Sequence, residues 1–75
     1  MGLHVKVQDL PRVGTRYDLA GARVPQRVSV VVHKDGHREL YAFEAAGTDP
    51  TAVIELTEDQ ARLLAAVLNG SYVVD

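Results

Sequence analysis

A run of valines near the middle of the chain constrains its fold more than any other feature. In the segment RVSVVVH, residues 27–33, four of the seven residues are valine. Valine is restricted in a helix but packs well on a pleated sheet, so this segment is predicted to be a strand. Asp35-Gly36 follows it and is typical of a tight turn between antiparallel strands. The segment HRELYAF, residues 37–43, is the predicted partner strand, which makes 27–43 a central hairpin.

Segments before and after this hairpin are also predicted to be extended. Residues 3–10, LHVKVQDL, alternate apolar and polar side chains, which predicts a strand with one buried face. Shorter strands are predicted at residues 15–20 and 51–56. Loops are predicted in between, where glycine and proline recur, at residues 11–14, 21–26 and 44–50.

One helix is predicted after the last strand. Thr57 is a suitable N-cap, and Gln60 three residues later completes a capping box. Apolar side chains then recur with helical spacing and form a stripe, at Ala61, Leu64, Ala65 and Leu68. Gly70 ends the pattern, so the helix is predicted at about 58–69. Strands followed by one amphipathic helix indicate an α+β fold, in which the helix packs on a small antiparallel sheet of about three to five strands.

The composition limits the classes of protein to which this chain can belong. Hydrophobic residues make up 47% and charged residues 24% of the 75 residues, as in a single globular domain. The net charge is −2 and the basic residues are scattered, so nucleic-acid binding is not expected. There is no cysteine, and no apolar run reaches the roughly 18 residues of a membrane span. We therefore expect a cytoplasmic domain without direct membrane insertion.

Two histidines flank the predicted turn, and the hairpin register decides whether they share a face of the sheet. A two-residue loop at 35–36 opposes His33 to Arg38 and places the two imidazoles on opposite faces. A three-residue loop at 34–36 opposes His33 directly to His37. Both registers give acceptable apolar faces, so the sequence leaves them open.

The residues around the turn do not by themselves predict a chemical site. A zinc site needs about three or four protein ligands, and only Asp35 and Glu39 lie near enough in sequence to join the two histidines. We therefore predict a solvated hairpin tip and no metal site. No nucleophile has a base at a meaningful spacing, and no glycine-rich phosphate loop is present. Neither catalytic nor cofactor-binding residues are predicted, and the chain is not expected to be an enzyme.

An ordered series of short motifs is informative as a whole. It consists of LPRVGTRYDL at 10–19, VSVVVHKDGHRELYAF at 28–43, Asp49-Pro50, and IELTEDQARLLAAVLNG at 54–70. The series resembles the N-terminal domain of bacterial potassium/proton antiporter regulatory subunits. In that family the first motif is L-P-G-[IV]-G, and the central strand ends in H-x-D-G-R-R-E. The chain departs from this pattern at Arg12, where the family often has glycine, and at His37, where arginine is common.

The resemblance implies a role and a domain organisation. Residues 1–75 would be a single N-terminal regulatory or interaction domain, without the ligand-binding C-terminal domain found in the family. That absent domain dimerises and binds cyclic di-AMP in some members, so no cofactor is expected in this chain. The implied function is that of a non-catalytic regulatory module of a membrane cation/proton antiporter. It would act through protein–protein contact or oligomer packing, as part of a homodimer held at the membrane by its partner.

The hairpin tip is the candidate surface for partner contact, with His33, Asp35, His37 and Arg38 as the contact residues. The alternative function is a general protein-interaction or oligomerisation domain unrelated to transport. In that case the strand at residues 3–9 would pair with a second copy, because exposed edges recruit strands.

Overall fold

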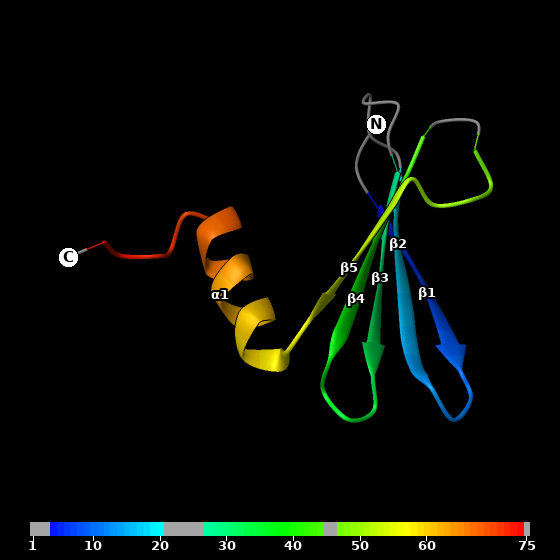
Figure 1. Cartoon of the computed structure of the whole chain (residues 1–75), viewed down its shortest axis with the longest axis horizontal. Coiled ribbons are helices and arrows are strands. Elements are labelled where there is room, and N and C mark those ends of the chain that lie inside the picture. Colours follow the sequence, from blue (N-terminus) through cyan, green and yellow to red (C-terminus); the bar gives the residue numbers. More distant parts are fainter. Residues whose placement is uncertain (1–3, 21–26, 45–46, 75) are drawn as a thin grey trace.

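The structure is a computed structural model that describes residues 4–20, 27–44 and 47–74. It contains five strands and one helix, in the order β1 (His4–Leu10), β2 (Gly14–Ala20), β3 (Arg27–His33), β4 (Arg38–Phe43), β5 (Ala52–Leu56) and α1 (Glu58–Leu68). Each strand pairs antiparallel with the next along the chain, so the sheet is a meander with β3 at its centre (Figure 1). The predicted α+β fold is confirmed. The predicted loop at 21–26 and residues 45–46 of the loop at 44–50 lie outside the described residues.

The register of the four strand pairs divides the side chains between two faces of the sheet. One face, here called the apolar face, carries Val5, Val7, Tyr17, Leu19, Val28, Val30, Leu40, Ile54 and Leu56. The other, here called the polar face, carries Lys6, Gln8, Arg16, Asp18, Ser29, Val31, His33, Glu39, Tyr41 and Phe43. The predicted alternation is present in β1, but the predicted burial of its apolar side is wrong, because Val5 and Val7 are 52% and 60% exposed at the edge of the sheet.

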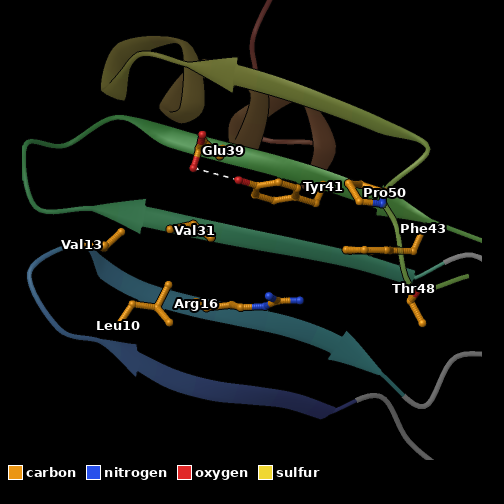
Figure 2. Close-up of a pocket in the computed structure, with 9 residues that line it drawn as sticks. All are labelled: Leu10, Val13, Arg16, Val31, Glu39, Tyr41, Phe43, Thr48 and Pro50. Carbon is orange, nitrogen blue, oxygen red and sulfur yellow. Dashed lines mark hydrogen bonds between the residues drawn. The ribbon is translucent and has the colours of Figure 1, made fainter.

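Burial is deepest on the polar face. Among the described residues, the side chains of Ser29, Val31 and Phe43 are the buried ones. Thr48 and Pro50, from the segment before β5, border the same hollow as Phe43 (Figure 2). Long polar side chains and this segment therefore shield the centre of the polar face from solvent.

The helix begins where its N-cap predicts and contacts the sheet only lightly. The Gln60 backbone N–H donates to Thr57 Oγ1 at 3.1 Å, and the Thr57 backbone N–H donates to Gln60 Oε1 at 2.9 Å. The predicted stripe faces the apolar face of the sheet and lines a cavity of about 220 Å³ with Val30, Leu40 and Leu56. None of residues 58–68 is buried, however, because α1 stands beside β5 rather than over the centre of the sheet (Figure 1).

Candidate functional site

The β3–β4 connection is a three-residue turn over residues 34–36. The His33 backbone N–H donates to His37 O at 2.9 Å, and the Gly36 N–H donates to His33 O at 3.0 Å. Gly36 has φ 101°, in the left-handed region that glycine tolerates. His33 therefore directly opposes His37, and the three-residue loop is the correct one of the two registers left open by the sequence.

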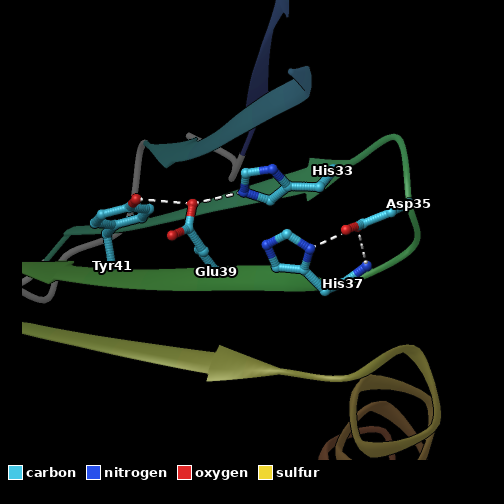
Figure 3. Close-up of polar contacts among 5 residues, drawn as sticks. All are labelled: His33, Asp35, His37, Glu39 and Tyr41. Atoms are coloured by element: carbon cyan, nitrogen blue, oxygen red, sulfur yellow. Dashed lines mark hydrogen bonds and ion pairs between the residues drawn. The ribbon is translucent and has the colours of Figure 1, made fainter. Parts of the chain in front are cut away.

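This register brings the two histidines and a carboxylate together on the polar face. The imidazoles of His33 and His37 are stacked, with centroids 3.8 Å apart and planes inclined by 13°. His33 Nε2 lies 2.6 Å from Glu39 Oε1, and the Tyr41 hydroxyl donates to the same oxygen at 3.0 Å. Figure 3 shows Tyr41 and Glu39 on one strand of the hairpin, His33 on the other strand, and His37 beside His33 near the turn.

Asp35 holds the second histidine from the turn. The His37 backbone N–H donates to Asp35 Oδ1 at 3.0 Å, and His37 Nδ1 lies 2.5 Å from the same oxygen. The backbone hydrogen bond and then the imidazole lower the pKa of Asp35 below its ordinary value. Asp35 is therefore a carboxylate in ordinary conditions, and it must accept a proton that His37 carries on Nδ1.

The carboxylate of Glu39 is also kept ionised by its neighbours. Its hydrogen bond with His33 is the largest influence and lowers the pKa of Glu39, and the smaller effect of burial does not reverse this. Burial raises the pKa of Tyr41, and the hydrogen bond to Glu39 adds to the increase. The hydroxyl therefore remains a donor that orients the Glu39 carboxylate.

Arg38 lies apart from the other three predicted contact residues. It opposes Val32 in the ladder, on the side of the sheet that carries Leu40, and it borders the cavity beneath the α1 stripe. Its guanidinium folds back and donates to the Gly36 carbonyl. The structure therefore gathers His33, Asp35 and His37 but places Arg38 towards the helix.

A second polar cluster lies further along the polar face, on β2 and β3. Arg16 Nε donates to Asp18 Oδ1 at 3.0 Å, and the Ser29 hydroxyl donates to the same oxygen. Burial acts to raise the pKa of Asp18, but the hydrogen bonds from Ser29 and Arg16 outweigh it and hold the pKa below its ordinary value. The sequence did not single out this cluster. The sequence does contain an indication of it: Arg16 and Asp18 are two positions apart on a predicted strand, so their side chains lie on the same face.

Between the two clusters the polar face is hollowed. The hollow has a volume of about 370 Å³ and is bordered by Leu10, Val13, Arg16, Val31, Glu39, Tyr41, Phe43, Thr48 and Pro50 (Figure 2). Within the three described segments, no helix has the length and apolar character needed to cross a bilayer.

The fold is a small α+β domain built on an antiparallel meander. At the turn of its central hairpin it carries a polar cluster, here called the hairpin cluster, of His33, Asp35, His37, Glu39 and Tyr41. Residues 3–72 match the family described as K(+)/H(+) antiporter subunit KhtT, N-terminal domain, and the chain belongs to that family. The resemblance inferred from the motif series is therefore confirmed. The family is defined by a transporter subunit rather than by an enzymatic activity.

Two proteins of Bacillus subtilis (strain 168) are similar to this chain. One is named K(+)/H(+) antiporter subunit KhtT and is 32% identical over 69 residues, which cover 91% of this chain and 41% of the relative. The other is named uncharacterized protein YrvC and is 29% identical over 69 residues, with the same two coverages of 91% and 41%. The chain thus spans about two fifths of the length of the curated relatives that it matches.

Proposed function

We propose that this chain is a non-catalytic regulatory module of a potassium/proton antiporter, acting through contact with the transporter. The match of residues 3–72 to the antiporter-subunit family carries this proposal. The similarity to the B. subtilis protein named as a K(+)/H(+) antiporter subunit supports it. In this proposal the domain works in the cytoplasm as the N-terminal part of a longer, dimeric subunit that reaches the membrane through its partner.

The contact surface that we propose lies at one end of the sheet, where two turns meet. The Lys34 N–H donates to Val13 O at 2.9 Å and so joins the β1–β2 turn to the β3–β4 turn. We call residues 11–13 and 33–38 the tip surface. Figure 1 shows both turns at the same end of the sheet.

The tip surface has the properties expected of a contact surface. It combines the exposed charged residues Arg12, Lys34 and Asp35 around a hollow of about 300 Å³. Tight turns fix the backbone that carries these groups, so little backbone entropy is lost when a partner binds. Side chains of both signs allow the surface to select a partner with complementary charge.

The proposal is tested by copurification with the cognate membrane antiporter. The full-length subunit that contains this chain is expressed with a tagged antiporter, and the bound fraction is measured. We expect Lys34→Ala and Asp35→Ala, two exposed changes on the tip surface, to weaken binding by roughly fivefold or more, as at contact residues. Glu44→Ala is the matched control, because Glu44 is exposed just beyond the opposite end of β4.

Two outcomes count against the proposal. If neither the chain nor the full-length subunit copurifies with the antiporter, the regulatory role is wrong. If Glu44→Ala weakens binding as much as the tip variants do, the tip surface is not the contact. The mass of the full-length subunit in solution tests the proposed dimer separately.

A further inference from the structure

We propose that His33, His37 and Glu39 form a binding site for a divalent transition-metal ion, with zinc as the best match. Each residue offers one ligand atom, and these atoms all lie within 4.8 Å of one another. Zinc bonds of about 2.0–2.1 Å in a tetrahedron place neighbouring ligand atoms about 3.3 Å apart. The ligand atoms are therefore close enough for rotation of the side chains, chiefly that of His37, to bring them onto one ion. This inference concerns the chain alone and does not depend on the proposed function.

The backbone holds the three ligands in position. His33 and His37 are opposite each other and linked by the backbone hydrogen bond of 2.9 Å, while Glu39 lies two residues further on the same face. Two adjacent strands and a three-residue turn leave little freedom to the Cα atoms. A site on rigid elements loses less entropy on binding an ion than a site on a loose loop.

Asp35 prepares the imidazole of His37 for an ion. The distance of 2.5 Å from His37 Nδ1 to Asp35 Oδ1 fixes the proton on Nδ1, so Nε2 keeps its lone pair. A carboxylate behind a ligating imidazole is the usual second partner in zinc sites, where it sets the tautomer and raises the basicity of the ligand.

The pair formed by His33 and Glu39 offers the other two ligands. In their 2.6 Å hydrogen bond His33 Nε2 donates its proton to Oε1 of the ionised Glu39, and an ion would replace that proton. The two atoms must then separate by about 0.7 Å to reach the spacing found around tetrahedral zinc. Tyr41 keeps the carboxylate oriented from behind through its 3.0 Å hydrogen bond.

Binding must break the imidazole stack. The lone pairs of two rings inclined by only 13° lie in separate, nearly parallel planes, so a single ion cannot accept both. The His37 side chain is 37% exposed and that of His33 is 20% exposed, so His37 has more room to turn. Two imidazoles and one carboxylate suit zinc, copper or nickel rather than magnesium, and water would complete the tetrahedron.

Calorimetric titration of the metal-free chain with ZnCl₂, and separately with MgCl₂, tests the site. We expect one zinc ion per chain and no binding of magnesium. His37→Gln and Glu39→Gln each remove a ligand and should weaken zinc binding by more than about tenfold, while Asp35→Asn should weaken it by about 10–100-fold. His4→Gln is the matched control, because His4 is exposed on β1 at the far edge of the sheet.

Nuclear magnetic resonance of the imidazoles in the unsubstituted chain gives a readout that needs no variant. Zinc should shift the ring signals of His33 and His37 and leave those of His4 in place. The proposal is overturned if zinc does not bind, if the His33 and His37 signals do not move, or if His37→Gln and Glu39→Gln, folded by circular dichroism, bind zinc as well as the unsubstituted chain. None of these results bears on copurification with an antiporter.

Discussion

Arg12 occupies a backbone conformation that favours glycine. Its φ is 70°, in the turn where the Val13 N–H donates to Leu10 O at 3.0 Å. The left-handed conformation costs a residue with a Cβ about 1–2 kcal/mol. The backbone of Arg12, where the family often has glycine, is therefore strained, and the turn keeps the conformation that suits glycine.

We predict that Arg12→Gly raises the free energy of unfolding by about 1 kcal/mol, because glycine removes the strain but adds entropy to the unfolded chain. Urea denaturation measures this change. Arg12→Ala is the control: it removes the same guanidinium but keeps the Cβ, so no comparable gain is expected. Equal stabilisation by the two variants would show that the charge of Arg12, rather than its φ angle, is responsible.

Asp18 gives the sheet a defined response to acid. Its pKa is lowered from 3.8 because the hydrogen bonds from Ser29 and Arg16 outweigh burial. A carboxyl group whose pKa is lower in the folded state stabilises the fold above its unfolded pKa, and this contribution disappears as the pH falls through the folded value. Glu39, whose pKa is lowered from 4.5 chiefly by His33, acts in the same direction.

We therefore predict that the urea concentration at the midpoint of unfolding decreases when the pH is lowered from about 5 to about 3. Asp18→Asn cannot lose a charge, and Ser29→Ala removes a hydrogen bond to Asp18, so both variants should lose less stability over this interval. Unfolding curves at the two pH values measure the difference. If Asp18→Asn loses as much stability between the two pH values as the unsubstituted chain does, other carboxylates are responsible for the effect.

The helix depends on its own cap more than on the sheet. Thr57 and Gln60 exchange two hydrogen bonds, and none of residues 58–68 is buried. We predict that Thr57→Ala destabilises α1 by about 1 kcal/mol, whereas Thr57→Ser keeps the accepting hydroxyl and has little effect. The helical signal in far-UV circular dichroism measures both variants. A helical signal unchanged in Thr57→Ala would show that the sheet, and not the cap, holds α1.

Local sequence signals predicted most of the elements, because strand alternation and the helix cap need no distant contact. The β3–β4 register could not be predicted in this way. Both loops gave acceptable apolar faces, and the turn is tied by the Lys34 N–H to Val13 O, across about twenty residues of chain. The stripe of the helix was predicted to face the sheet, but its shallow contact is a tertiary property without a local signal.

The hairpin cluster shows the same limit at the level of the site. His33, His37 and Glu39 were visible in the sequence, but they formed a set only once the register placed them on one face. Tyr41 was missed because its role depends on standing two residues beyond Glu39 on that face. The β3–β4 register is thus what decides whether this hairpin is only a turn or also a candidate metal site.

At the scale of the whole molecule, stability is distributed unevenly. β3 is paired along both edges and contains two of the buried side chains, those of Ser29 and Val31. By contrast, none of the residues of α1 is buried, and Leu68, at the end of its apolar stripe, is 76% exposed. Regions with few buried contacts open at lower free energy than the core does.

We predict that backbone amides exchange with solvent slowest in β3 and much faster in α1, as measured by hydrogen exchange with residue resolution. Because the helix opens without the sheet, Thr57→Ala should speed exchange in α1 by about fivefold, which corresponds to 1 kcal/mol, and leave β3 unchanged. If α1 and β3 are equally protected, and Thr57→Ala speeds both alike, the helix and the sheet unfold as one unit. The light contact between α1 and β5 would then be energetically sufficient to couple them.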